Sequence, residues 1–195
     1  MSGLALTFDD GPDPVWTGRL LDLLADLGAR ATFFPISGRA AARPELVERM
    51  LAEGHSVGIH CCEHVRHGDR DEAWLRRDTE NALAALWGLG VAPVYWRPPW
   101  GETAPWTVTV ARELGLHLVG WTADTHDWRG DSAEEMLEAT RHLLGAGSIV
   151  LAHDGIGPGA RRDTPEETLR YVELVAEVAA ARELSLEALE LGAPA

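Results

Sequence analysis

Positive charge is the first thing that this sequence has little of. Its 195 residues include 31 acidic and 17 basic side chains, which give a formal net charge of −14 at pH 7. Every basic residue is an arginine, because the sequence contains no lysine. Proteins that bind nucleic acids rely on clustered basic side chains to neutralise phosphates. We therefore expect no nucleic-acid partner.

Cysteine and long apolar runs are scarce as well. The only two cysteines, Cys61 and Cys62, are adjacent, and neighbouring cysteines rarely form a stable bridge, so no disulfide framework is expected. No apolar run approaches the ~18 residues of a membrane-spanning helix. The first run, Leu4–Phe8, follows no basic start and is too short for a secretory signal. These absences predict a cytoplasmic protein with no membrane partner, and they leave the oligomeric state open.

The remaining composition is typical of a soluble globular protein, with 46% hydrophobic and 25% charged residues. The length fits one domain, so we expect residues 1–195 to form a single unit.

Short apolar runs alternate with longer amphipathic stretches along the chain. The predicted strands are Leu4–Phe8, Ala31–Phe34, Ser56–His60, Val94–Arg97, Leu118–Thr122, Ser148–His153 and Leu184–Leu189. The predicted helices are Trp16–Leu27, Pro44–Glu53, Asp71–Leu89, Thr103–Leu114, Ser132–Leu144 and Pro165–Arg182. This alternation predicts an α/β fold with parallel strands, namely a distorted (β/α) barrel of about seven strands, with an open doubly wound sheet as the alternative.

Candidate metal ligands follow two of the predicted strands. Asp9 and Asp10 end the first strand, where one carboxylate can bind a metal while the other faces a substrate; a helix cap before Trp16 is the alternative. His60 and His64, four residues apart after the third strand, can converge on one ion. With Asp10 they form a set of two histidines and one carboxylate, which leaves coordination positions open for water and substrate.

Other side chains near this pair have weaker claims. We expect His67 to lie behind the metal ligands or at the surface, Glu63 to point away, and Cys61 and Cys62 to be reduced packing residues. Whether His67 or either cysteine contributes to the metal site stays open.

Polar residues also follow the later strands. Arg97 can hold a carboxylate with two hydrogen bonds, in a loop stiffened by Pro98 and Pro99 and followed by Trp100. His153 follows an apolar run and is a candidate proton donor, which Asp124 could orient and keep charged. His126 and Asp154 are interpreted as loop-structural residues. The loop from Gly155 to Arg162 is expected either to contact substrate through Arg161 and Arg162 or to be solvated.

Taken in order, these segments resemble the polysaccharide deacetylase family, carbohydrate esterase family 4, which includes the nodulation-type chitooligosaccharide deacetylases. Five motifs carry the resemblance: Thr7–Asp10, the His60 and His64 pair, Arg97–Pro99, Asp124–Trp128 and Leu151–His153. It implies a distorted β/α barrel and the removal of an acyl group, notably acetyl, from the nitrogen of an amino sugar.

The resemblance also implies a role for each site residue. Asp10, His60 and His64 would hold a divalent metal, usually zinc (Zn2+) and sometimes cobalt (Co2+) or another divalent ion. Asp9 would be the general base and Arg97 would orient it, whereas Asp124 would tune His153 as the general acid. Trp100, Trp128, Leu151 and Pro99 would contact the substrate, with Trp128 and Leu151 around the acyl methyl group. Ile59 and Cys61 depart from the Asn and the Ser or Thr that are usual beside the first histidine, which leaves loop stability and metal preference open.

The expected substrate is a small molecule or a short oligosaccharide. Two other functions remain as alternatives. One is hydrolysis of a different C–N bond, in a formamide, a cyclic imide or an acetylated polyamine. The other is a non-catalytic sugar-binding module.

Overall fold

A computed structural model describes residues 3–190 and confirms the α/β fold. Its strands are short: β1 (Ala5–Asp9), β2 (Thr32–Phe34), β3 (Ser56–Val57), β4 (Tyr95–Trp96), β5 (His117–Leu118), β6 (Ala123–Asp124) and β7 (Ile149–His153). The α-helices are α1 (Trp16–Asp26), α2 (Ser37–Ala42), α3 (Pro44–Ala52), α4 (Glu72–Trp87), α5 (Thr107–Glu113), α6 (Ala133–Thr140) and α7 (Glu166–Ala181). Short 3₁₀ turns include η1 (His67–Asp69), η2 (Pro99–Gly101), η3 (Asp127–Arg129) and η4 (Arg141–Leu143).

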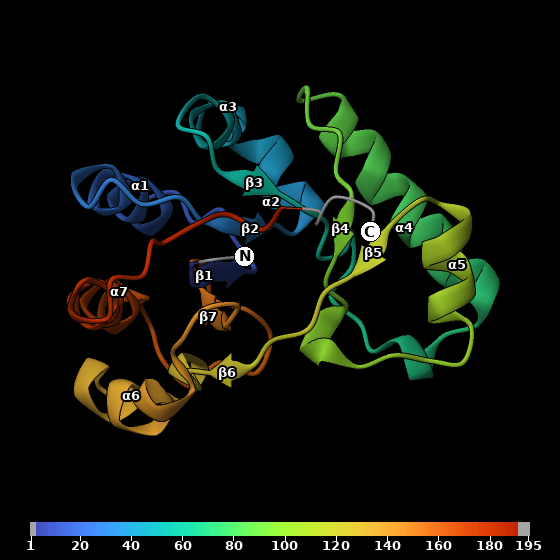
Figure 1. Ribbon diagram of the computed structural model, residues 1–195. Coiled ribbons are helices and arrows are strands. Elements are labelled where there is room, and N and C mark those ends of the chain that lie inside the picture. The colour runs from blue at the N-terminus through green and yellow to red at the C-terminus, as the bar shows by residue number, and fades with distance from the viewer. Residues whose placement is uncertain (1–2, 191–195) are drawn as a thin grey trace, which may run out of the picture.

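Every strand pair in the described part of the chain is parallel. One sheet has the order β3-β2-β1-β7-β6, and β4 pairs with β5 in a second, two-stranded sheet. A parallel bridge between Ile59 and Trp96 joins the two sheets just beyond β3. Figure 1 shows the strands in a central arc with helices around the outside, which places the carboxyl ends of all the strands on one side of the molecule.

The predicted barrel is not closed within residues 3–190, because no strand pair joins β5 to β6. Of the segment predicted as the strand Leu118–Thr122, only Leu118 lies in a strand, at the end of β5, and residues 119–122 form the connection to β6. The carbonyl groups of Val119 and Gly120 accept hydrogen bonds from the Arg97 guanidinium group, at 3.4 and 3.0 Å. These carbonyls therefore face a side chain rather than a neighbouring strand, and Arg97 lies at the open seam.

Three further differences from the expected elements have local causes. The predicted strand Leu184–Leu189 is wrong, because within it Leu186 forms only an isolated bridge with Leu4. The helix α2 was not predicted, since its six residues are too few to show a periodic apolar stripe. The helix predicted over Thr103–Leu114 starts late, at Thr107, because Pro105 disfavours helical backbone at the residue before it.

The core lies between the sheet and the helices around it. Phe8 of β1 stacks on Phe33 of β2 with 5.4 Å between ring centroids. Leu20, Leu21 and Leu24 form the buried stripe of α1. This packing fixes β1, β2 and β7 side by side, so the residues at their carboxyl ends have defined positions. None of the helices in the described residues has the length and apolarity needed to cross a membrane.

Candidate active site

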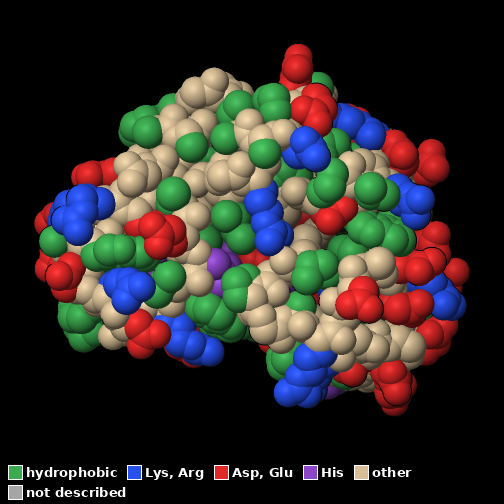
Figure 2. All heavy atoms as spheres, turned by 180° about the vertical axis from the view of Figure 1, so that it is seen from behind, with side chains coloured by type: hydrophobic (Ala, Val, Ile, Leu, Met, Phe, Trp, Pro, Cys, Tyr) green, Lys and Arg blue, Asp and Glu red, His purple; other side chains and the backbone are tan. Residues whose placement is uncertain are grey.

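A cavity of about 460 Å³ lies at the carboxyl ends of the strands. Asp9, Asp10, His60, His64 and His153 all line it. Figure 2 shows the corresponding hollow on the face opposite to the view of Figure 1, with histidine and acidic side chains at its floor and arginine side chains near its rim. The topology therefore brings together residues that are widely separated along the chain.

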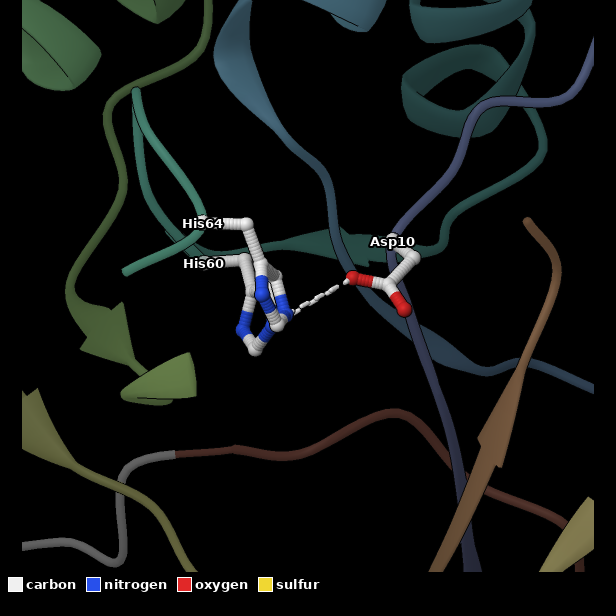
Figure 3. Close-up of side chains that lie close together, drawn as sticks. All are labelled: Asp10, His60 and His64. Carbon is white, nitrogen blue, oxygen red and sulfur yellow. Dashed lines mark ion pairs between the residues drawn. The ribbon is translucent and has the colours of Figure 1, made fainter. Parts of the chain in front are cut away.

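Asp10, His60 and His64 form a compact group of potential metal ligands. One ligand atom from each lies within 4.8 Å of the others. The Nε2 atoms of His60 and His64 are 3.5 and 3.3 Å from Oδ1 of Asp10, and Figure 3 shows both rings pointing toward this carboxylate. The predicted set of two histidines and one carboxylate is thus assembled in space.

Local backbone structure directs these side chains. Asp10 follows β1 and has a left-handed backbone with φ of 73°, which turns its carboxylate out of the strand direction. Gly157, in the loop after β7, packs against the carboxylate so closely that a Cβ there would lie 1.9 Å from Oδ2. The Nδ1 atom of His60 donates to the carbonyl of Arg97 at 2.8 Å, which leaves the Nε2 lone pair free to bind a metal.

The chemistry of the group fits a cation. Oδ1 of Asp10 is buried and receives no hydrogen bond from a backbone N–H or hydroxyl in the described structure. Burial alone raises the pKa of Asp10, but the contact with His64 and the charges of His60 and His153 outweigh it and lower the pKa to about 2. Burial lowers the pKa of His60. An ionised carboxylate and a neutral imidazole are the forms that bind divalent metals.

Asp9, the neighbour of Asp10, belongs to a different pair. The Nη1 atom of Arg97 donates to Oδ1 of Asp9 at 2.9 Å and to the Thr7 hydroxyl at 2.7 Å. Arg97 is fully buried, and its guanidinium group lies over the ring of Phe34 at 4.4 Å. Its contacts with Thr7, Val119 and Gly120 fix the position from which it orients Asp9.

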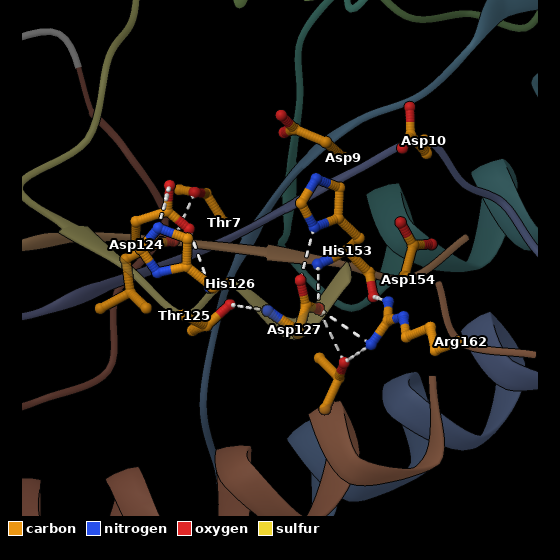
Figure 4. A network of polar contacts seen from close by, with 12 residues as sticks. Thr7, Asp9, Asp10, Asp124, Thr125, His126, Asp127, His153, Asp154 and Arg162 are labelled. Atoms are coloured by element: carbon orange, nitrogen blue, oxygen red, sulfur yellow. Dashed lines mark hydrogen bonds and ion pairs between the residues drawn. The ribbon is translucent and has the colours of Figure 1, made fainter. Parts of the chain in front are cut away.

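His153, at the end of β7, is paired with Asp127 (Figure 4). The Nδ1 atom of His153 lies 2.7 Å from Oδ1 of Asp127, whose Oδ2 accepts the backbone N–H of His153 at 2.9 Å. The buried carboxylate also contacts Arg162 at 3.0 Å and accepts the Thr168 hydroxyl at 2.8 Å. Burial lowers the pKa of His153, but Asp127 outweighs it, with help from the charges of Asp10 and Asp9, and raises the pKa to about 9.

The prediction that Asp124 is the partner of His153 is therefore wrong. Oδ1 of Asp124 accepts the backbone N–H of His126 at 2.8 Å, and its Oδ2 lies 3.8 Å from the ring of the same residue. Asp124 lines the cavity, but its carboxylate bonds within the turn at His126 and not to His153. The strand β6 ends at Asp124 and the chain turns at His126, which has φ of 55°, so the second aspartate of the segment is the one directed beneath His153.

The model of the family described as polysaccharide deacetylase matches residues 2–119. The chain belongs to the polysaccharide deacetylase family. It is 35% identical to a peptidoglycan-N-acetylglucosamine deacetylase of Bacillus cereus over 154 residues, which cover 78% of this chain and 72% of that protein. It is 34% identical to a chitooligosaccharide deacetylase of a Bradyrhizobium species over 167 residues, covering 85% and 76%.

A solved structure agrees with this family assignment. A family 4 carbohydrate esterase from Streptomyces lividans, in complex with acetate, superposes with a TM-score of 0.85 at 31% identity, over 94% of this chain and 91% of that one. The family-model match ends before Asp127 and His153. The pairing of these two residues therefore rests on the geometry of the structure.

Of the predicted substrate contacts, Trp100, Trp128 and Leu151 line the cavity. Pro99, the first residue of η2, does not line the cavity, because its side chain is buried. Trp121, which was not predicted as a substrate contact, also lines the cavity and packs against Gly101, where a Cβ would lie 2.3 Å from the indole ring.

His67, Cys61 and Cys62 lie outside the group of potential metal ligands. The Nδ1 atom of His67 is 3.0 Å from the Thr107 hydroxyl, and its ring lies beside Trp96. Cys61 is buried and its burial raises the pKa of the thiol. Neither His67 nor the two cysteines belongs to the potential metal group found in the described residues. They act as packing residues around it.

Thr168 was not predicted as a site residue, and Arg162 was expected to contact substrate or to be solvated, not to contact Asp127. Arg162 extends from the loop after β7 and donates to the His153 carbonyl at 2.9 Å, and Thr168 belongs to the first turn of α7. No spacing in the sequence relates either of them to Asp127, since the contact depends on how α7 packs beside β7.

Proposed function

We propose that this protein is a metal-dependent N-deacetylase that hydrolyses the acetamide of an amino sugar, a short oligosaccharide or a related glycoside. The observation that carries the proposal is the register of β1 and β7, which places Asp9 beside His153 next to the Asp10–His60–His64 group. The two curated relatives, deacetylases of peptidoglycan N-acetylglucosamine and of chitooligosaccharides, support an amino-sugar substrate. Acetate in the Streptomyces structure supports acetyl as the acyl group.

The ligand set favours zinc. Two imidazoles and one carboxylate, with coordination positions left for water and substrate, are typical of catalytic zinc sites, and Co2+ or another divalent ion is the alternative. An ion held by Asp10, His60 and His64 supplies a Lewis acid that activates water and polarises a carbonyl oxygen.

Asp9 is proposed as the general base. Hydrolysis of an amide at neutral pH requires a group that takes a proton from the attacking water. Asp9 lines the cavity next to the ligand group, and Arg97 occupies one of its oxygens from behind. Arg97 thereby fixes the orientation of the carboxylate toward the reacting water.

His153 is proposed as the general acid. The departing amine needs a proton, and a pKa of about 9 keeps His153 protonated at neutral pH. Asp127 holds the Nδ1 side of the ring. The Nε2 atom is thus the one that donates the proton to the leaving nitrogen.

The walls of the cavity suit a sugar with a small acyl group. Trp100 and Trp128 present indole rings, which have large apolar faces against which a sugar ring can stack. The buried side chain of Leu151 lines the same cavity as the two tryptophans and His153. It can contact an acyl methyl group there.

The test is acetate release from a panel of N-acetylglucosamine oligomers, by protein stripped of metal with a chelator and then supplied with Zn2+ or Co2+. We expect activity only after metal addition. Asp9→Asn should lower kcat by about 10²–10⁴-fold, because a positioned general base contributes that much. It should leave metal affinity nearly unchanged, because Asp9 is not in the ligand group. The exposed Asp26→Asn is the matched control.

Three results would contradict the proposal in different ways. Full turnover by Asp9→Asn would remove the assigned base. Hydrolysis limited to formamides, cyclic imides or acetylated polyamines would favour the other class of C–N bond. Sugar binding without turnover of any amide would favour a binding module.

A further inference from the structure

The loop between the two metal-binding histidines is held from behind by one acidic side chain of α4. Oδ2 of Asp78 accepts the backbone N–H of Cys62 at 3.0 Å, and Oδ1 accepts the backbone N–H of Glu63 at 2.8 Å. Both amides lie between His60 and His64. We infer that Asp78 is a positioning residue of the metal site, which fixes the backbone that carries His64; this inference rests on the proposed metal-dependent function.

Asp78 is well placed for this role. It is only 8% exposed and lies on the buried stripe of α4, together with Leu75, Ala82 and Leu86. No arginine or histidine forms an ion pair with it among residues 3–190. The hydrogen bonds that compensate its buried charge therefore come from the loop, and a buried carboxylate without them would be costly.

The loop has no internal side chain that could replace Asp78. The residues between the histidines are Cys61, Cys62 and Glu63, none of which carries a hydroxyl group. A thiol is a weak hydrogen-bond donor, and Cys61 is buried. In the described structure, Asp78 is the side chain that bonds to the backbone amides of this segment.

The two histidines differ in how their second ring nitrogen is held. Nδ1 of His60 is bonded to the Arg97 carbonyl, as described above. Nδ1 of His64 is buried and has no hydrogen-bond partner within the described residues. The ring of His64 is contacted edge-on by Trp100, with 4.2 Å between centroids, but this contact does not fix a ring nitrogen. The position of His64 therefore depends more on its backbone, and hence on Asp78.

The experiment compares zinc affinity and stability of the full chain. Zn2+ affinity is measured by competition with a coloured chelator for the wild type, Asp78→Asn, Asp78→Ala and Glu63→Gln. Thermal unfolding is recorded for each in excess EDTA. Asp78→Asn keeps the size of the side chain but turns one acceptor into a donor that faces an N–H. Glu63→Gln removes one negative charge from the exposed face of the same loop and leaves its backbone amide in place.

We expect both Asp78 variants to weaken zinc binding by about 10–100-fold, the usual effect of losing a group that orients a metal ligand. Glu63→Gln should change it by less than about threefold, because an exposed charge interacts weakly through water. If Asp78→Asn lowers the melting temperature in EDTA but binds zinc as tightly as the wild type, Asp78 is only structural and the inference fails. If the wild type itself binds no metal, it is the proposed function that fails.

A second measurement needs no variant. In the metal-free wild type, the amides of Cys62 and Glu63 should exchange with deuterium slowly, because Asp78 holds both. Rapid exchange of these two amides, alongside slow exchange of the α4 amides, would overturn the inference even if the Asp78 variants do not fold.

Discussion

Two buried ion pairs lie beside the floor of the candidate active site, and the acidic and basic partners are placed in opposite order in the two pairs. In the first, the carboxylate of Asp9 faces the cavity and the cation Arg97 lies behind it. In the second, the imidazole of His153 faces the cavity and the carboxylate of Asp127 lies behind it. The side chains of both rear partners are fully buried, at 0% exposure, whereas those of Asp9 and His153 are 4% and 15% exposed.

The difference between the pairs explains how neighbouring strands can carry the opposite proton-transfer roles proposed for Asp9 and His153. Asp9 and His153 are register partners on β1 and β7, so the sheet alone gives them similar surroundings. The hidden partner has the opposite charge in each pair: Arg97 stabilises an anion, and Asp127 stabilises a cation. Each rear partner therefore carries the charge that suits the role proposed for its front group.

The largest effect should come from removing the rear carboxylate. Asp127→Asn is expected to lower kcat by about 100-fold or more, because the imidazole loses the partner that orients it and keeps it charged. The pKa of His153 is raised to about 9, so the protonated acid is present below this pH and is lost as the pH rises through it. Without Asp127, the alkaline limb of kcat should move to lower pH. A pH–rate profile of the variant measures both changes.

Asp124→Asn provides the matched control, since it removes a carboxylate three residues away that also lines the cavity. We expect its alkaline limb to stay where it is in the wild type, because Asp124 bonds to His126 rather than to His153. A shift in this variant, with none in Asp127→Asn, would reverse the assignment of the rear partner.

The choice between these two aspartates marks the limit of what the sequence could predict for the site. Asp10, His60 and His64 were predictable because each follows an apolar run, and parallel strands bring their carboxyl ends together. Asp124 and Asp127 belong to one motif, and their spacing does not say which of them lies under His153. That depends on the turn at His126, whose left-handed backbone has no clear sequence signal.

The fold, too, could be predicted from the sequence only in part. The alternation of strands and helices was predictable from apolar periodicity, and the sheet is parallel as expected. The open seam between β5 and β6 was not, because it results from carbonyl groups that turn toward Arg97 over a distance of more than twenty residues. Asp78 did leave a sequence signal, an acidic residue on the apolar stripe of a helix, but not the identity of the amides it binds.

An intermediate effect is expected for Arg162, which shares Asp127 with His153. Arg162→Ala should lower kcat by about tenfold, because Asp127 loses one of the groups that fix its position. It should also move the alkaline limb of kcat upward, since the field of Asp127 then acts on His153 without a competing cation. This shift is opposite in sign to that of Asp127→Asn, and pH–rate profiles of the two variants compare them directly.

Arg162→Lys tests whether charge alone is sufficient. Lysine keeps the charge but cannot reproduce the planar set of donors that reaches Asp127 and the His153 carbonyl together. We expect a wild-type alkaline limb with a partial loss of kcat. Arg170→Ala, which removes an exposed arginine of α7, should change neither quantity. An alkaline limb that does not move in Arg162→Ala would mean that Arg162 only supports the loop.

The smallest effect should come from the outer rim, where the two adjacent arginines of the loop after β7 differ. Arg162 turns inward to Asp127, whereas Arg161 is exposed, with its guanidinium group 5.8 Å from the centre of the Trp128 ring. The backbone N–H of Arg161 donates to the Trp128 carbonyl at 2.7 Å, which joins this loop to η3 at one wall of the cavity. Arg161→Glu should raise KM about two- to fivefold for an acetylated amino sugar that carries a carboxylate, since an exposed charge contributes up to about 1 kcal/mol.

KM for a neutral oligomer and kcat for both substrates should stay the same, as should all constants of the distant exposed variant Arg112→Glu. Equal KM values for Arg161→Glu and the wild type with both substrates would show that this part of the loop is only solvated, and would restrict substrate contact to Trp128 and the residues inside the cavity.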